Sequence, residues 1–542
     1  MRKTIKKRLA FILAPLLVVT TISAFKTDFF EITKQIEIYN SLFKAINMNY
    51  VDQTNPAELM SSGVKKMLLN LDPYTVYGSE QDVENAKMRR SGDFVGIGAD
   101  LRFIKGKLTV YELYKGLSAD NAGLKPGDEI IKINGVDVLE QNQGVDILLG
   151  GKQNTEVEIV YLRNSKETLV KVRRGNKKPK AVPIFKISDS GVGYIALTGF
   201  SRGAAKEVES ALKFLLIDEA KGLILDLRNN PGGLLQEAVN IVNLFVPKDQ
   251  LVVSTRSYIK KYNKQFVTRQ QPLSLDIPLV ILVNEQSASA SEIVAGALQD
   301  LDRAVIIGKQ SFGKGLVQQP QPLPYGAQVK ITISRYYTPS GRCIQAVDYR
   351  NKGKTGVAQR SKDQNVIFKT KKGRTVYGGG GIMPDINSGT RADFNLIRIL
   401  KNNNFFFNYA VNYNKTNTGI NINKFALKEG DFKSFKNYCL AEGFNLETTT
   451  ESYLKQALGA SEDEGLAIIT KTLENINNDL EREKEKVFNL LKLEVEQSLS
   501  EEIIKTNFYK EGMYEYALSN NHTIQAAKAL LVKSDDYYNI LE

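Results

Sequence analysis

The chain has 542 residues, 42% of them hydrophobic, so its composition excludes a disordered or low-complexity protein and leaves room for about two to four packed cores. The formal net charge is +13, but five of the positive charges fall within the first eight residues. The remaining excess is scattered, and there is no zinc-ligand spacing, phosphate-binding loop or RNA-binding aromatic motif, so we expect no nucleic-acid partner. Cys343 and Cys439 lie far apart and predict no disulfide framework.

Residues 1–25 predict an export signal. A basic start is followed by an apolar run over residues 9–25, which is marginal in length for crossing a bilayer. Ser23 and Ala24 offer a cleavage point, so a signal peptide and a signal anchor both fit. The basic flank would stay in the cytoplasm, and we therefore expect an exported, periplasmic protein, anchored to the inner membrane by residues 9–25 if they are retained.

Residues 26–91 predict a helical region. Apolar residues such as Ile32, Ile36 and Leu42 recur at helical spacing from Phe29 onward. The sequence Asp-Pro-Tyr-Thr at residues 72–75 should end the helix.

Residues 92–175 change to short β runs separated by turns. The Gly-Leu-Lys-Pro-Gly-Asp turn at residues 123–128 and the Ile-Asn-Gly that ends at Gly135 resemble a PDZ domain. Such a domain binds a peptide as an added strand and captures its free carboxylate with backbone N–H groups. The resemblance assigns this capture to the loop Gly96, Ile97, Gly98 and Ala99. A β module that binds nothing is the plainer alternative.

Residues 176–388 predict an α/β core. Buried strands are expected at residues 193–196, 222–227 and 279–283, with a helix over residues 204–216 between the first two. The second strand leads into Arg-Asn-Asn-Pro-Gly-Gly at residues 228–233, a glycine turn whose N–H groups suit an oxyanion. Asp226, Arg228 and Asn230 fit a simpler role, fixing this turn by charge-assisted hydrogen bonds. The basic stretch 352–374 is expected to be a solvated loop.

Three serines separated by alanines follow the strand over residues 279–283. Ser287, Ser289 and Ser291 stand between this strand and a helix, where a tight turn projects a hydroxyl and the N-terminus of the helix favours an oxyanion. An ordinary helix cap fits each of them as well, and chemistry alone does not choose among the three.

An activated serine needs a base, and the chain has a single histidine, His522, in a polar stretch far along the sequence. A Ser-His-Asp triad is therefore not expected, and a Ser-Lys pair is the available route. Lys314 lies between two glycines after a strand that begins at Val305, where burial can lower its pKa. Gln318 can orient the neutral amine.

The Ser-Ala-Ser-Ala-Ser-Glu run, together with Phe-Gly-Lys-Gly-Leu-Val-Gln at residues 312–318, resembles the C-terminal processing (tail-specific) serine peptidases. The Leu-Asp-Pro-Tyr-Thr motif at residues 71–75 and the glycine turn at residues 226–233 fit the same family. The resemblance implies Ser289 as nucleophile, Lys314 as base, Gln318 as assisting amide, and the amides of Gly233 and Ala290 as the oxyanion hole, with no metal or cofactor. Relatives often carry an arginine where this chain has Gly150, and Lys152 is a less specific substitute.

Residues 389–542 predict a helical C-terminal extension that packs on the core or mediates assembly, with a strongly charged helix around residues 462–498. The expected fold is thus a multidomain α/β protein: helical segment, PDZ-like module, Ser-Lys peptidase core and helical extension.

The expected function is an exported serine endopeptidase that reads protein tails with free apolar C-termini through its PDZ domain. An adaptor protein, an inner-membrane anchor and a homodimer are left open as partners. The alternatives are a catalytically silent PDZ scaffold and, further off, a carrier of lipophilic ligands.

Overall fold

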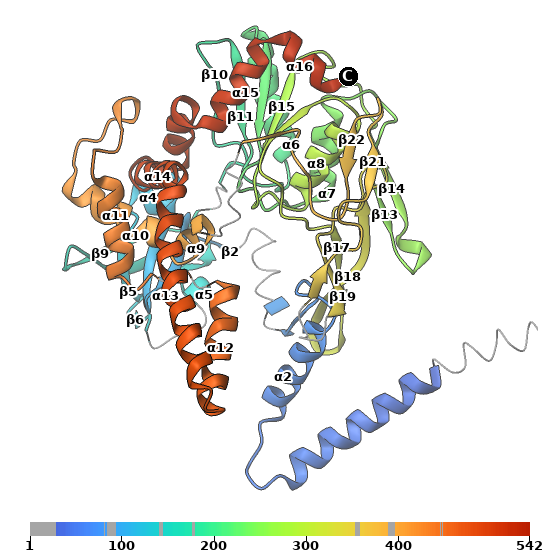
Figure 1. Ribbon diagram of the computed structural model, residues 1–542, viewed down its shortest axis with the longest axis vertical. Coiled ribbons are helices and arrows are strands. Elements are labelled where there is room, and N and C mark those ends of the chain that lie inside the picture. Colours follow the sequence, from blue (N-terminus) through green and yellow to red (C-terminus); the bar gives the residue numbers. More distant parts are fainter. Residues whose placement is uncertain are drawn as a thin grey trace, which may run out of the picture. The chain divides into compact units, whose positions relative to one another are not determined.

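The computed structural model describes residues 29–80, 82–83, 94–139, 145–175, 179–352, 358–388, 396–444, 446 and 448–542. The predicted export signal lies outside these residues. Two compact units divide the chain, Met1–Tyr77 and Gly78–Glu542 (Figure 1). None of the helices in the described part of the chain is both long and apolar enough to cross a bilayer.

The first unit is helical, as its sequence predicts. A helix covers residues 29–49, α2 covers Pro56–Leu69, and β1 (Val76–Gly78) follows. Asn55 caps α2, since its side-chain oxygen accepts the N–H groups of Ala57 and Glu58 at 3.1 and 3.3 Å. After α2, the carboxylate of Asp72 accepts the N–H groups of Tyr74 and Thr75, each at 2.8 Å, which explains why this motif ends the helical region.

The PDZ-like module is an antiparallel sheet with the strand order β3-β4-β5-β8-β9, and β6 pairs with β5. Two short helices and the pair β2·β7 complete it. Its apolar side chains, Leu108, Val110, Ile130 and Ile159 among them, form one core. The elements are β2 (Phe94–Val95), β3 (Ala99–Ile104), β4 (Lys107–Leu113), α4 (Ser118–Asn121), β5 (Glu129–Ile133), β6 (Val136–Asp137), α5 (Val145–Leu149), β7 (Gly151–Lys152), β8 (Glu156–Arg163) and β9 (Lys166–Arg173).

The core sheet of the second unit has the order β10-β11-β12-β15-β16-β23, and its strands are parallel except at the β10 edge. Its central strands are buried on both faces, which agrees with their unbroken apolar sequences. The strands are β10 (Phe185–Ile187), β11 (Val192–Ala196), β12 (Gly222–Asp226), β15 (Leu279–Val283), β16 (Val305–Gly308) and β23 (Ile386–Asn387).

Helices cover both faces of this sheet, and they come from distant parts of the chain (Figure 1). One face packs against α6 (Ala204–Ile217), α7 (Leu235–Asn243) and α8 (Ala290–Asp300). The other packs against the end of α14 (Lys492–Asn520), α15 (His522–Val532) and α16 (Ser534–Leu541). The predicted C-terminal extension therefore supplies one layer of the core.

A second sheet stands beside the core, in which β18 (Gln328–Tyr337) pairs with β17 (Leu316–Pro322) and β13 (Leu251–Arg256), and β13 pairs with β14 (Lys264–Val267). The prediction of a solvated basic loop over residues 352–374 holds for most of its described basic side chains, which are exposed, but not for Arg374 or for the backbone, which forms strands. The described part of that stretch contains two whole strands and the last residue of another, and Arg374 is largely buried in ion pairs with Asp302 (2.6 Å) and Asp385 (2.8 Å). The strands of this region are β19 (Val347–Lys352), β20 (Ala358–Arg360), β21 (Ile367–Lys369) and β22 (Thr375–Tyr377).

The remaining C-terminal helices build a core of their own and contact the PDZ-like module. The core is built by α9 (Leu396–Asn402), α10 (Phe405–Thr416), α11 (Asp431–Ala441) and the end of α13 (Ala467–Leu490), packed with the first half of α14, and α12 (Thr449–Asp463) packs against α13. Tyr509 interrupts α14 with φ 63° and ψ −170°. Its hydroxyl donates to Asp120 in α4, and Lys510 pairs with Glu112 of β4 at 2.6 Å. Helix α14 thus contacts the module midway and the core sheet at its end.

Candidate active site

Three loops that follow β12, β15 and β16 meet at the carboxyl edge of the core sheet. The strands are neighbours and parallel, so their carboxyl ends point the same way. The loops carry, in order, the glycine turn, the three serines and Lys314. Direct backbone bonds join them: Ala288 N–H donates to Asn230 O at 3.0 Å, and Phe312 N–H donates to Ser287 O at 3.0 Å.

The structure distinguishes the three serines. Ser287 is fully buried and its hydroxyl donates to Leu227 O at 2.8 Å, and Ser291 is fully buried and donates to Asn230 O at 2.9 Å. Both hydroxyls therefore hold loops together. Ser289 is half-exposed, and its backbone has φ 58° and ψ −112°, a strained conformation for a residue with a side chain. This is the geometry of a nucleophile elbow.

The carboxylate of Glu292 joins the serine turn to the lysine loop. One oxygen accepts the N–H groups of Ser289 (2.8 Å) and Lys314 (2.9 Å). The other accepts the Ser311 hydroxyl (2.6 Å) and the Gly313 N–H (2.7 Å). Burial raises the pKa of Glu292, and these four hydrogen bonds oppose the rise. One buried side chain therefore fixes the backbones of both predicted catalytic residues.

In the sequence, Glu292 stands three residues after Ser289, and this spacing predicts only the start of a helix. Its capping-box spacing from Ser289 was the available signal. Its bonds to residues 311–314 arise from the packing of two distant loops, which local sequence does not contain.

Lys314 is half-buried, and its pKa is lowered, first by burial and then by the positive charge of Lys330, while Glu292 acts in the opposite direction. The direction is the one that a lysine base requires. Gln318 lies on β17, opposite Thr332 of β18, and its side-chain amide donates to the Thr332 hydroxyl at 3.2 Å.

The glycine turn packs directly against the serine turn. At Gly232, with φ 96°, a Cβ atom would lie 2.6 Å from Ala288 O and 2.8 Å from the Ala290 nitrogen. Gly233 forms a parallel bridge with Phe200, in which Gly232 O and Leu234 N make the bonds. The N–H of Gly233 therefore points away from Phe200, and that of Ala290, at the first position of α8, has no acceptor within its helix.

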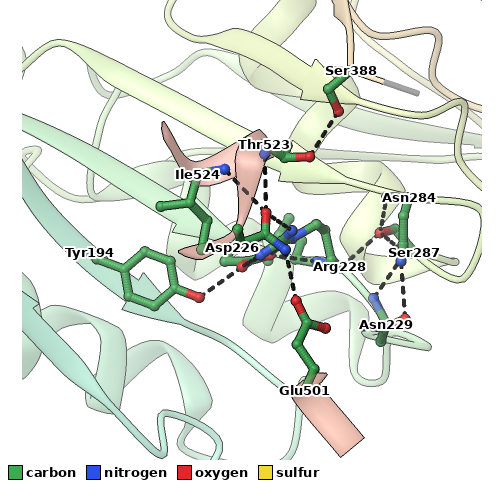
Figure 2. A network of polar contacts seen from close by, with 12 residues as sticks. Tyr194, Asp226, Arg228, Asn229, Asn284, Ser287, Ser388, Glu501, Thr523 and Ile524 are labelled. Carbon is green, nitrogen blue, oxygen red and sulfur yellow. Dashed lines mark hydrogen bonds and ion pairs between the residues drawn. The ribbon is translucent and has the colours of Figure 1, made fainter. Parts of the chain in front are cut away.

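Asp226 and Arg228 fix the start of this turn, as the simpler prediction has it. Arg228 makes a two-pronged ion pair with Asp226 at 2.6 to 3.1 Å, and Tyr194 donates to the same carboxylate at 2.7 Å (Figure 2). Next along the chain, Asn229 and Asn284 exchange hydrogen bonds of 2.9 and 3.0 Å, which ties the glycine turn to the loop before the serines.

The predicted carboxylate loop of the PDZ-like module lies between β2 and β3. The carbonyls of Gly96, Ile97 and Gly98 each accept a backbone N–H, from Gly175, Ala119 and Tyr114 respectively. Among the described residues, no hydrogen bond uses the N–H of Ile97 or Gly98. The Ile97 side chain is buried in the module core, so the loop is held firmly from behind.

An arginine from elsewhere in the chain, Arg174, lies beside the end of α5, next to Gly150. The guanidinium of Arg174 donates to Leu149 O at 2.8 Å and to Leu148 O at 3.1 Å, at the end of α5. Lys152 is exposed on β7. A ring nitrogen of His522 lies 3.2 Å from Ser388 O. Cys343 and Cys439 are both buried and free.

Comparisons with known proteins match three segments. Residues 95–173 match the model of the PDZ domain, residues 191–351 that of peptidase family S41, and residues 396–531 that of the probable PDZ-protease C-terminal helical domain. A solved structure of the photosystem II D1 C-terminal processing protease matches at 25% identity with a TM-score of 0.36, over 60% of this chain and 91% of that one.

Curated relatives agree. The carboxy-terminal processing protease CtpA of Bacillus subtilis is 33% identical over 307 residues, 56% of this chain and 66% of that protein. A probable CtpA-like serine protease of Staphylococcus aureus is 35% identical over 325 residues, 59% of this chain and 64% of that protein. The chain thus spans just under two thirds of the length of these relatives. The chain thus carries a PDZ domain and a core of peptidase family S41, and it is similar to the C-terminal processing proteases.

Proposed function

We propose that the protein is a serine endopeptidase in which Ser289 attacks the scissile carbonyl and Lys314 takes its proton. The observation that carries this proposal is the pair of loops joined by Glu292, one with the strained, half-exposed Ser289 and the other with a lysine whose pKa is lowered by burial. Gly233 and Ala290 offer N–H groups to the oxyanion, and Gln318 orients the neutral amine. Lys314 then passes the proton to the leaving amine.

We infer that the substrates are protein tails with free apolar C-termini, captured by the loop Gly96 to Ala99. Two N–H groups of this loop, those of Ile97 and Gly98, make no other bond within the described residues and suit a carboxylate. Export, with or without an inner-membrane anchor, is inferred from the sequence of residues 1–25 alone.

The test uses the exported portion as wild type, Ser289→Ala and Lys314→Ala, with an unstructured protein that has a free apolar C-terminus and the same protein amidated. We expect cleavage by the wild type alone, faster on the free carboxylate, while Ser289→Ala still binds the tail. If Ser289→Ala still cleaves, another serine is the nucleophile. If the wild type binds the tail and does not cleave, the protein is a PDZ scaffold.

A further inference from the structure

The start of α15 lies against the start of the glycine turn. Asn521, between α14 and α15, is 1% exposed, and its side-chain oxygen accepts the Nη1–H of Arg228 at 2.8 Å. Arg228 belongs to the core and Asn521 to the C-terminal helices, 293 residues apart. This buried contact therefore joins the catalytic edge of the sheet to the last layer of the fold.

The side chain of Asn521 is held on both sides. Its oxygen also accepts the N–H groups of Thr523 (3.1 Å) and Ile524 (3.3 Å), and so caps α15. Its amide donates to Glu501 at 2.8 Å. Figure 2 shows Glu501, Thr523 and Ile524 around the Asp226–Arg228 pair. Asn521 thus presents a fixed acceptor to Arg228.

The turn after Arg228 needs such support. Asn229, Gly232 and Gly233 all have positive φ, at 58°, 96° and 151°. Local sequence alone does not hold three such residues in place, so contacts from outside the turn must. Arg228 is the first residue of the turn, and its side chain has only two anchors among the described residues, Asp226 and Asn521. An oxyanion hole works only when its N–H groups are placed to within a fraction of an ångström.

We propose that Asn521 is a positioning residue for peptide-bond cleavage, which holds the Gly232–Gly233 turn through Arg228. The C-terminal helices are then part of the catalytic apparatus. This inference rests on the proposed function, in which the Gly233 N–H binds the oxyanion.

The test compares Asn521→Ser with the control Asn520→Ser. Serine caps a helix about as well as asparagine, but it is too short to reach Arg228. Asn520 is exposed, and among the described residues its side chain bonds to its own helix alone, at Tyr516 O. We expect Asn521→Ser to lower kcat about tenfold with KM unchanged, because the loss falls on the transition state, and Asn520→Ser to leave both constants as they are.

Arg228→Lys tests the same contact from the core without touching the cap of α15. Lysine keeps a charge beside Asp226 but has no counterpart of the Nη1–H group that donates to Asn521. We expect a similar fall in kcat, and the double variant should lose no more than Arg228→Lys does. Arg228→Lys also tests the contact between Arg228 and Asn521 if Asn521→Ser does not fold.

A second arm is a swap. The double variant Asn521→Asp with Glu501→Gln keeps an oxygen at position 521 that accepts from Arg228. The bond between positions 521 and 501 is also kept, but now the amide at position 501 donates and the carboxylate at position 521 accepts. We expect kcat to return to within about twofold of the wild type, since both contacts exist again.

The inference is overturned if Asn521→Ser keeps the wild-type kcat or loses no more than Asn520→Ser. It is also overturned if the losses add up in the double variant of Asn521→Ser with Arg228→Lys, or if the swap does not restore kcat. If the wild type itself does not cleave, it is the proposed function that fails.

Discussion

Lys314 gives the proposed reaction a pH dependence with a definite sign. A lysine base must be neutral to accept a proton, so the rate should rise with pH as Lys314 loses its proton. Its pKa is lowered by burial and by Lys330. The rising limb should therefore lie below the pH range in which an ordinary lysine titrates.

Replacing Lys330 tests this cause. Lys330→Met removes a positive charge, which should raise the pKa of Lys314 and move the rising limb of kcat/KM to higher pH. Lys206→Met, on the exposed side of α6, is the control and should leave the limb in place. A limb that stays fixed in Lys330→Met, or moves to lower pH, would contradict Lys314 as the base.

Glu292 offers a second test at the scale of one residue. In Glu292→Gln, one end of the side chain becomes an NH₂ group that faces two donors, either Ser289 and Lys314 or Ser311 and Gly313. We expect a loss of about 1–3 kcal/mol in the free energy of unfolding, the usual cost of buried unpaired donors, together with a fall in kcat. Urea unfolding followed by circular dichroism suits a chain without tryptophan. Unchanged stability would mean that the loops do not depend on this carboxylate.

Among single elements, the loop between β2 and β3 gives the sharpest prediction. A Cβ on Gly98, with φ 76°, would lie 2.6 Å from the Leu117 Cβ, whereas Gly106, with φ 79°, has nothing within 4 Å. Both Gly98→Ala and Gly106→Ala carry the cost of a positive φ. Only Gly98→Ala should displace the loop and weaken tail binding, by about tenfold, as measured with labelled free and amidated peptides on the Ser289→Ala background. Equal losses in the two variants would remove the carboxylate role from this loop.

The central strands were predictable because each is a continuous apolar run, and β12 and β15 lie where their sequences place them. The glycine turn and the lysine loop were predictable from spacing. Chemistry did not choose Ser289 from the three serines, because the burial of Ser287 and Ser291 depends on Leu227 and Asn230, about sixty residues away. The same limit explains why the burial of Arg374 was not predicted. Its charge predicts a side chain exposed to solvent, but its ion pairs with Asp302 and Asp385 allow it to be buried.

At the scale of the whole molecule, the sequence did not predict which surface α15 covers. An apolar helix face shows that something covers it but not which surface does. Here Ile524 packs on the core sheet, and Gly222 leaves room on β12 for Leu531, whose nearest atom lies 3.1 Å from where a Cβ would be.

A substitution in α15 should therefore weaken the peptidase core. Ile524 is fully buried and Val532, at the end of the same helix, is 60% exposed. We expect Ile524→Ala to cost about 2–5 kcal/mol of the free energy of unfolding, as large-to-small core changes do, and Val532→Ala to change it by less than about 0.5 kcal/mol. If the two variants unfold alike, α15 is an appendage and not a layer of the core.

The position of α15 and α16 also sets the order of events as the chain is made. Synthesis runs from the N-terminus, so β15, β16 and the loops after them, which carry Ser289 and Lys314, emerge more than two hundred residues before the helices α15 and α16 that cover one face of their sheet. Until residues 521–542 follow, that face lacks α15 and α16, and Arg228 lacks its hydrogen bond to Asn521. A chain that has not yet reached α15 therefore leaves one apolar face of its core sheet uncovered.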